Sequence, residues 1–485
     1  MKVTKKDYLF LLVCIGLGLL AEVSFFHGRI GVSYLVFVAG FYAILFYRTG
    51  FAFYHRRIGL LLMLTIWILA GSYLYFDSVL FYYLNLLVIP ILMYLHVILI
   101  TTPEKYNWAS SYFTVILKSK LQQLFHYISD FFRSLFKRLF KDLEADTAKV
   151  LKHIFLGVAF SLPLLFVVGG LLMSADSVFE EMLSSLPSFL LELNFLEGFF
   201  RTAVVIVLAF VFFGLFQIIR LKRFPKRPPL DPFKKDTEWE GITSVTILII
   251  LNLLYGLFAG IQFTYFFGGS LEEGLTYAEY ARRGFFELSI VTLINWTLLI
   301  SFLSFVKASY KLKRVLKVLY TLLIVFSAVL LVSAYQRLSM YEAAYGYTID
   351  RVLAHGFMIF LMVIFAYTLI KVWLERVSLL HFYLIAALLF YTGLNAVNVE
   401  QVVTKQNVTR YETKEKIDID YLYSLSYTGW GGLLELYQSE PDYPGLQPML
   451  HRIGERLQEK EAGPWQSYNF KRQEIKKKFE ELGFY

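Results

Sequence analysis

Eleven long apolar runs constrain the fold of this 485-residue chain more than any other feature. A helix of about 20 residues crosses about 30 Å of hydrocarbon, and most of these runs are that long. Backbone groups in hydrocarbon must bond within their own segment, so we expect helices rather than strands. The sequence therefore predicts an all-α, polytopic transmembrane helix bundle of about eleven spans: Tyr8–Phe26, Val32–Tyr47, Ile58–Phe76, Val79–Ile100, Ile154–Met173, Thr202–Ile219, Ile242–Phe267, Phe285–Phe305, Val315–Tyr335, Val352–Ile370 and Leu379–Val399.

The composition supports a lipid environment. Apolar residues make up 57% of the chain, the mean hydropathy is +0.56, and charged residues make up 18%, against about 25% in a typical soluble domain. A soluble protein of this length has no core large enough to bury so much apolar surface. The lipid bilayer is therefore the first expected partner.

The basic residues predict an orientation. If the N-terminus is cytoplasmic, the inner loops carry 28 Lys and Arg and the outer loops carry 5. This asymmetry follows the positive-inside rule and predicts a multi-pass protein of the cytoplasmic (inner) membrane, with its N-terminus in and its C-terminus out. The segment 401–485 has 12 basic and 13 acidic residues. A nucleic-acid partner is not expected, because such proteins gather positive charge on one soluble face.

We expect four parts along the chain. Residues 1–101 form an N-terminal four-span segment, and residues 102–150 hold a cytoplasmic basic amphipathic helix. Residues 151–400 form a seven-span bundle, and residues 401–485 form a small helical extracytoplasmic tail. In this tail Leu450, Ile453 and Leu457 recur at helical spacing.

The amphipathic segment 112–143 has apolar residues at helical spacing on one face and Lys118, Arg133 and Lys137 among those on the other. Such a helix can lie on the anionic inner leaflet with its apolar stripe in the acyl boundary. The alternative is a helix that packs on another cytoplasmic element. We favour the membrane surface, with anionic inner-leaflet lipids as partners.

Polar and charged residues gather where the last four spans meet their outer loops. Ionisable residues in spans are costly and are candidates for function. Two interpretations remain: a water-filled outer vestibule that binds a ligand, or a structural ion-pair network, which we favour. The candidate outer polar cluster comprises Glu279, Arg282, Arg283, Glu287, Asn295, Arg337, Tyr341, Glu342, Arg351, Asn395 and Asn398.

Sequence motifs point to no catalytic residue, no metal site and no cofactor. Cys14 is the single cysteine, so neither a CxxC motif nor an intrachain disulfide is available. The eight histidines form no HExxH motif, and no GxSxG or Walker loop occurs. Asn407-Val-Thr409 matches a glycosylation sequon, a weak signal on its own.

Several stretches resemble a bacterial family of uncharacterised multi-pass membrane proteins, a domain of unknown function of the DUF4153/DUF4173 type. The clearest runs from Tyr277 to Leu288 (YAEYARRGFFEL), and others are Ser174–Phe179, Arg337–Gly346, Asn395–Arg410 and Trp465–Asn469. The resemblance covers roughly Leu156 to the C-terminus and, more loosely, the first span. It implies a membrane fold and no particular activity.

Three function classes remain open. We favour an envelope scaffold or sensor that uses its outer face and C-terminal tail; it predicts a closed polar cluster and an exposed aromatic patch near Tyr427–Trp430 that binds an envelope protein partner. A transporter or permease predicts a cavity near Glu287, Asn295 and Asn252. An outer-face membrane enzyme predicts an acid and a base that open sideways to lipid.

Overall fold

The computed structural model describes residues 5–50, 53–139, 193–220, 223–225, 239–268, 285–459 and 463–484, with the isolated residues 157, 161, 168 and 172. Over these residues the regular structure is helical, apart from two parallel strands of two residues each, β1 (Trp239–Glu240) and β2 (Val306–Lys307). Ten of the described helices are long and apolar enough to cross a membrane. The predicted all-α, multi-pass membrane architecture is therefore confirmed.

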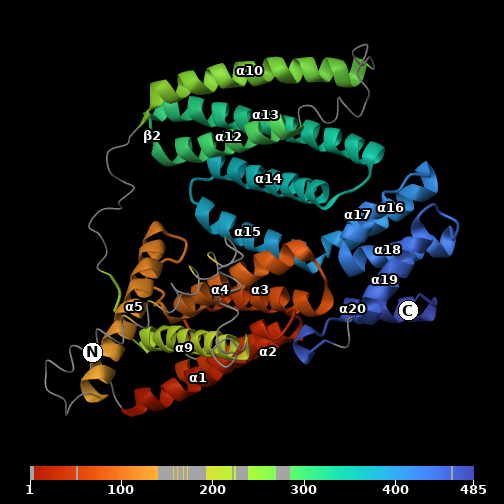
Figure 1. Ribbon diagram of the computed structural model, residues 1–485. Helices are drawn as coiled ribbons and strands as arrows, with labels where there is room; N and C mark the ends of the chain where they lie inside the picture. The colour runs from red at the N-terminus through yellow and green to blue at the C-terminus, as the bar shows by residue number, and fades with distance from the viewer. Residues whose placement is uncertain are drawn as a thin grey trace.

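The N-terminal bundle has one continuous apolar core, in which Leu17, Phe41, Leu69 and Phe216 are almost fully buried. Its spans lie side by side in the lower half of Figure 1. Gly18 lets α1 approach α9 closely, because a Cβ there would lie 2.7 Å from the Val205 carbonyl oxygen. The elements are α1 (Lys5–Phe26), α2 (Val32–Thr49), α3 (Arg56–Tyr75), α4 (Val79–Thr101), α5 (Ser111–Leu139) and α9 (Leu193–Arg220).

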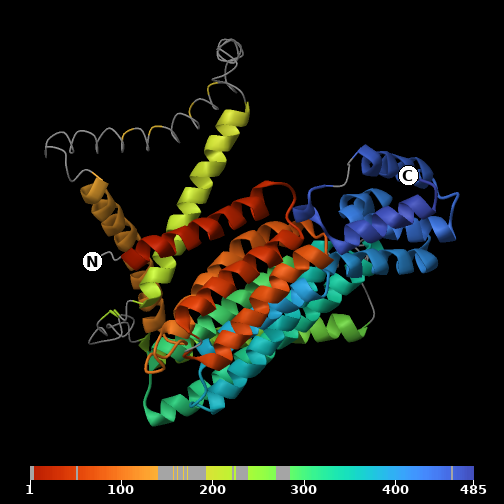
Figure 2. The same cartoon turned by 90° about the horizontal axis from the view of Figure 1, so that it is seen from below.

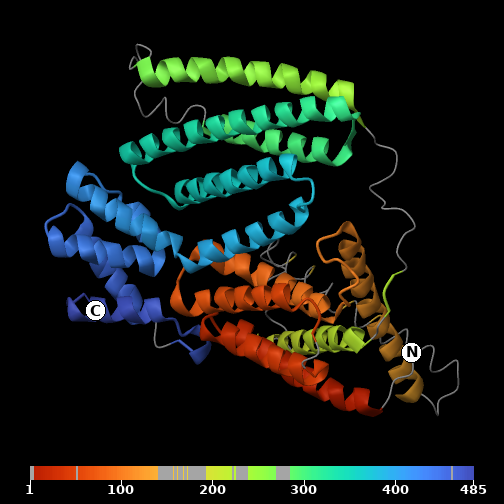
Figure 3. The same ribbon diagram turned by 180° about the vertical axis from the view of Figure 1, so that it is seen from behind.

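The C-terminal bundle forms a second core around Leu299, Phe302, Leu323 and Leu361. It occupies the upper half of Figure 1, and α15 (Leu379–Ala396) lies between the two bundles, in contact with α14 and α3 (Figures 1 and 3). The bundle consists of α10 (Gly241–Gly268), α12 (Phe285–Phe305), α13 (Tyr310–Tyr345) and α14 (Ile349–Trp373).

The helices after α15 form a small C-terminal domain with its own core, in which Leu450, Ile453 and Leu457 are buried as their spacing predicts. Figure 2 shows this domain at one end of the spans, which we name the domain side; the opposite end is the far side. The domain comprises α16 (Val399–Lys414), α17 (Ile419–Ser424), α18 (Ser426–Ser439), α19 (Leu446–Glu459), the 3-10 helix η2 (Trp465–Ser467) and α20 (Phe470–Glu481).

Ten of the eleven predicted spans correspond to described helices, and the fifth, Ile154–Met173, lies outside the described residues. Helices α1 and α9 run antiparallel. Their far-side ends meet where Gln217 donates a hydrogen bond to Asp7 at 2.8 Å. At their domain-side ends, Arg201 lies 3.7 Å from Glu22.

Helix α5 differs from the prediction for segment 112–143. Part of its apolar stripe packs on protein: Phe131 is fully buried against Tyr8 and Phe213. Lys120 is buried too, and its Nζ donates to the Ile218 carbonyl oxygen at 3.3 Å. This face therefore packs on the membrane spans themselves, a partner that neither interpretation named, because the far-side ends of α1 and α9 supply an apolar surface that hydropathy does not reveal.

Candidate functional site

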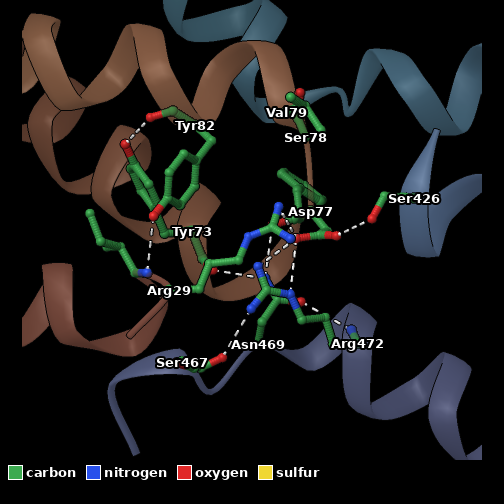
Figure 4. Close-up of polar contacts among 12 residues, drawn as sticks. Arg29, Tyr73, Asp77, Ser78, Val79, Tyr82, Ser426, Ser467, Asn469 and Arg472 are labelled. Carbon is green, nitrogen blue, oxygen red and sulfur yellow. Dashed lines mark hydrogen bonds and ion pairs between the residues drawn. The ribbon is translucent and has the colours of Figure 1, made fainter. Parts of the chain in front are cut away.

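A buried carboxylate joins the C-terminal domain to the spans. Asp77 lies between α3 and α4 and is 2% exposed. Arg472 of α20 donates to Asp77 Oδ1 from Nε at 3.0 Å and from Nη2 at 2.6 Å. Arg29 Nη2 lies 3.0 Å from the same oxygen, and the Ser426 hydroxyl donates to Oδ2 at 3.0 Å. Figure 4 shows how these side chains converge from separate elements. Two arginines and a hydroxyl group offset the cost of burying this charge.

Asn469 fixes the start of α20 beside Asp77. Its side-chain nitrogen donates to the Tyr73 carbonyl oxygen at 2.7 Å and to the Phe76 carbonyl oxygen at 2.8 Å, at the end of α3 (Figure 4). Its side-chain oxygen accepts the Arg472 backbone N–H at 3.1 Å and thereby caps the helix. Asn469 thus positions Arg472 against Asp77. We name Arg29, Asp77, Ser426, Asn469 and Arg472 the Asp77 cluster.

The chain before α2 holds the segment before α20 by a direct backbone contact. The Val32 N–H donates to the Tyr468 carbonyl oxygen at 3.0 Å. A Cβ at Gly31 would lie 2.3 Å from that same oxygen. Glycine is therefore required here by the close approach of two backbones.

Next to the Asp77 cluster is a cavity of about 20 Å³, lined in part by Ser72, Asp77, Asn395, Asn398 and Arg472. That volume holds about one water molecule. The predicted residues Asn395 and Asn398 therefore line a nearly closed polar junction rather than an open vestibule.

Glu400 closes this junction at the start of α16. Its Oε1 accepts the Val79 backbone N–H, the first of α4, at 3.2 Å. The pKa of Glu400 is raised to about 7, mainly because its carboxyl group is buried. Hydrogen bonds from Ser78 and Val79 oppose this shift, and the neighbouring Asp77 carboxylate contributes to it. A protonatable group thus lies beside the ion pairs of the Asp77 cluster.

A hydrogen-bonded triad fastens α15 to α4. Asn85 donates to Asn395 Oδ1 at 2.6 Å and accepts from the Tyr391 hydroxyl at 2.7 Å. Asn395 in turn donates to the Tyr391 carbonyl oxygen at 3.0 Å. Buried amides that satisfy each other in this way fix the register of two spans.

A second polar group forms where α13 and α14 meet on the domain side. Glu342 Oε2 lies 3.2 Å from His355 Nδ1, and His355 Nε2 lies 3.3 Å from the Ser339 hydroxyl oxygen. We name Ser339, Glu342 and His355 the His355 cluster. Beside it the Arg351 guanidinium lies 4.3 Å above the Tyr341 ring, and Arg337 is also buried on α13.

Asn407 joins the C-terminal domain to this second group. Its side chain accepts the Tyr347 N–H and donates to the Tyr347 carbonyl oxygen, both at 2.8 Å. Arg410 donates to the carbonyl oxygens of Ala343 and Ala344 at the end of α13. The Asn407 sequon is thus no glycosylation acceptor in the folded chain, because its amide is buried and bonded on both sides.

The residues of the predicted outer polar cluster lie in separate parts of the structure. Asn395 and Asn398 belong to the Asp77 junction, whereas Arg337, Tyr341, Glu342 and Arg351 gather at the α13–α14 junction. Asn295 lies apart in the C-terminal bundle, fully buried and bonded to the hydroxyl groups of Tyr255 and Ser327 at 2.7 and 3.0 Å. Glu287 is exposed on α12 and takes no part in either group. Glu279, Arg282 and Arg283 lie outside the described residues.

The expected exposed aromatic patch near Tyr427–Trp430 is wrong. Trp430 is 9% exposed, and its ring N–H donates to the Tyr423 carbonyl oxygen at 3.1 Å. The exposed aromatic residues lie nearby instead: Phe470 stacks on Tyr75 across the junction at 5.3 Å, beside Tyr468. The Trp430 face is covered because α18 packs into the domain core.

Sequence reasoning missed Asp77, Asn469 and Arg472. The available signal was a lone carboxylate in the short loop between two apolar runs, where a charge has no local partner. Ser339 was equally unmarked, because it stands in no catalytic motif. Across the described residues, no group of three or more His, Cys, Asp and Glu gathers to hold a metal ion.

No curated protein and no solved structure matches the chain. One family model does: the domain of unknown function DUF4153 matches residues 63–436. The match begins within α3 and ends within α18, so it leaves out α1 and α2 and includes the rest of the N-terminal bundle, the C-terminal bundle and the first helices of the C-terminal domain. It thus starts earlier than the resemblance at Leu156 suggested, and because it covers well over half of the chain, the protein belongs to the DUF4153 family.

Proposed function

We propose that this protein is an envelope scaffold whose C-terminal domain fixes the two helical bundles relative to each other and presents its free surface to a protein partner. The observation that carries the proposal is that one domain is bonded to both bundles on the same side. Arg472 reaches Asp77 of the N-terminal bundle. Asn407 pairs with Tyr347 of the C-terminal bundle.

A transporter has less support. Alternating access requires one group of helices to rock or slide against another around a central site. The Asp77 cluster and the Asn407–Tyr347 pairing oppose such motion. Near the middle of the C-terminal bundle, Asn252 donates to the Leu319 carbonyl oxygen at 3.1 Å, and Asn295 bonds to Tyr255 and Ser327. Both polar atoms of the Asn295 amide and the amide nitrogen of Asn252 are thus bonded within the protein, whereas the Asn252 side-chain oxygen has no partner among the described residues.

We assign the domain side to the extracytoplasmic face of a bacterial cytoplasmic membrane. The support is the distribution of charge: the far-side loops and helix ends are rich in Lys and Arg, as cytoplasmic loops are. Described examples are Arg56, Arg57, Lys105, Arg220, Lys307, Lys311, Lys313, Arg314, Lys371 and Arg376. On the same side, exposed Lys118 and Arg133 of α5 stand near exposed Leu121 and Phe125, which suits contact with anionic lipid headgroups.

The scaffold role can be tested by asking whether a variant whose C-terminal domain is detached from the spans still complements a deletion strain. The full-length chain with Asp77→Ala should still insert, but proteases added outside the cytoplasmic membrane should now cut the exposed residues around Glu415. In a strain that lacks the protein and shows an envelope defect, this variant should fail to restore growth. The matched control is Glu440→Ala, an exposed carboxylate on the same domain. Full complementation by a variant with a demonstrably released domain contradicts the proposal.

A further inference from the structure

The His355 cluster arranges a hydroxyl, an imidazole and a carboxylate in the order that nucleophilic catalysis uses. The Ser339 hydroxyl oxygen lies 3.3 Å from His355 Nε2, and His355 Nδ1 lies 3.2 Å from Glu342 Oε2. A nucleophile within hydrogen-bond reach of a base, itself oriented by a third group, is the general signature of such a site, and these bonds are often long before substrate binds. The same order of nucleophile, base and orienting group occurs on unrelated folds, so such a site is identified by its geometry and not by its fold.

Burial favours this arrangement. The Glu342 side chain is 3% exposed and that of His355 is 15% exposed, so the carboxylate is held deep while the imidazole reaches the surface. The Tyr335 ring lies 4.3 Å from the imidazole ring and fixes its plane. The Ser339 hydroxyl also lies 3.0 Å from the Tyr335 carbonyl oxygen, an ordinary contact for a helical serine. Its proton therefore has two acceptors within reach, and one of them, the Tyr335 carbonyl oxygen, also lies 3.3 Å from His355 Nε2.

An apolar groove leads away from the cluster along the outside of α13 and α14. It has a volume of about 220 Å³, and Tyr335 forms its end next to His355. The buried side chains of Leu331 and Met358 form its floor, and half-buried Met362 lies beside them, whereas the walls are exposed: Val332, Ile359 and Val363. Both helices are candidate spans, so these walls face lipid.

We propose that Ser339, His355 and Glu342 form a hydrolytic site for the carboxylic ester of a membrane lipid, whose acyl chain lies in the groove. The groove accepts a hydrocarbon chain and offers it no polar partner. The cluster lies one helical turn beyond the groove towards the domain side, where the ester carbonyl of a lipid would lie. This inference goes beyond the scaffold role and does not depend on it.

Hydrolysis of the ester at this site needs no reactant other than the ester and water. Ser339 Oγ forms a bond to the ester carbonyl carbon while His355 Nε2 takes the hydroxyl proton. The bond to the alcohol oxygen then breaks, and that oxygen takes the proton from Nε2. Water attacks the acyl-serine, gives its proton to Nε2, and the proton returns to Ser339 Oγ as the fatty acid leaves. Glu342 stays ionised and stabilises the imidazolium.

A serine-reactive reagent tests the nucleophile. The full chain in lipid vesicles is treated with a long-chain alkyl fluorophosphonate, and the labelled peptide is identified by mass. We expect label on Ser339 that is lost in Ser339→Ala and in His355→Gln. Ser301→Ala should label normally, because Ser301 is also a helical serine bonded to the carbonyl four residues back, without a histidine partner among the described residues. Label that persists in Ser339→Ala, or no label in the wild type, overturns the proposal.

Cysteine variants separate lost chemistry from lost folding. Cys14 is buried, so a new cysteine is the accessible thiol of the chain. At pH 7 Ser339→Cys should react with iodoacetamide about tenfold faster than Ser301→Cys, because an adjacent imidazolium stabilises the thiolate. His355→Gln should remove the difference. Equal rates at the two positions contradict the pairing of nucleophile and base.

Lipid hydrolysis tests the substrate class. Vesicles of phosphatidylglycerol and phosphatidylethanolamine that contain the protein should release fatty acid, and Ser339→Ala should reduce the release to that of empty vesicles. If vesicles with the wild-type protein release no more fatty acid than empty vesicles, the assignment of a lipid ester as substrate is overturned.

Discussion

Arg472 Nη2 lies 2.6 Å from Asp77 Oδ1, although the two residues stand 395 positions apart in the sequence. The contact joins the last helix of the C-terminal domain to the loop between the third and fourth helices. The last helix of the chain is thereby held against the domain-side ends of α3 and α4. This contact makes the domain part of the membrane bundle rather than a tethered appendage.

Removing one partner from the Asp77 cluster should release the domain. Breaking a buried ion pair leaves an uncompensated charge and costs about 3–5 kcal/mol, so Asp77→Ala should lower the stability of the domain attachment by that amount. Arg472→Gln should cost more than Arg29→Gln, because the Arg472 side chain is 13% exposed and that of Arg29 is 38% exposed. Hydrogen exchange of α20 measures the effect. Equal protection in all three variants contradicts it.

A side chain at Gly31 should separate the segment before α20 from the spans. The Cβ of Gly31→Ala meets the Tyr468 carbonyl oxygen. The Cβ is attached directly to the backbone and the oxygen belongs to it, so neither can move without moving the chain. We expect loss of the Val32–Tyr468 hydrogen bond and faster exchange of the Val32 amide. Gly71→Ala is the control, because a Cβ there meets no atom within 4 Å. Unchanged exchange in Gly31→Ala speaks against the close approach.

Glu400 should make the attachment sensitive to pH. Its pKa rises from the ordinary value of 4.5 to about 7 because the carboxyl group is buried, with Asp77 and Arg29 as the charged neighbours that oppose each other. The folded state therefore binds a proton that the unfolded state has lost, and stability falls as pH rises from about 4.5 through about 7. The shift corresponds to about 3 kcal/mol.

Thermal unfolding at pH 5 and pH 8 checks this prediction. The Glu400→Gln variant should lose less stability than the wild type between these two values. A fall in melting temperature of the same size in both proteins shows that Glu400 does not titrate in this range.

A single substitution in the amide triad between α4 and α15 should lower the stability of the protein. Asn395→Leu removes the shorter of two hydrogen bonds that the buried Asn85 side-chain nitrogen donates and leaves the one to the Ser72 hydroxyl at 3.2 Å. The loss of one such bond costs about 0.5–1.5 kcal/mol. The double variant Asn85→Leu with Asn395→Leu should recover part of that loss. A double-mutant cycle on thermal unfolding measures the coupling, and strict additivity contradicts it.

Hydropathy and charge predicted the spans because each depends on a local run of residues. The Leu450–Ile453–Leu457 stripe was predictable for the same reason. The Asp77–Arg472 contact was not, since no local spacing links residues so far apart. Most of the outer polar residues that the structure describes lie at the domain-side ends of their helices, whereas Asn295 lies within α12; those at the ends are Glu287, Arg337, Tyr341, Glu342, Arg351, Asn395 and Asn398. Their division into two groups depends on which helices are neighbours, and hydropathy does not specify that.

Helix α5 shows the same limit. Its apolar stripe has the pattern of a membrane-surface helix, yet Phe131 packs on Tyr8 and Phe213. An apolar face looks identical in sequence whether lipid or protein covers it.

The distance between the domain and the N-terminal bundle tests the account most directly. Spin labels at Tyr83→Cys in α4 and Glu455→Cys in α19, with Cys14→Ala in the background, report this distance by pulsed electron paramagnetic resonance in lipid vesicles. The scaffold account predicts one narrow distance distribution that becomes broad when Asp77→Ala is added. A broad distribution with Asp77 intact, or a distribution that Asp77→Ala leaves narrow and unchanged, contradicts it.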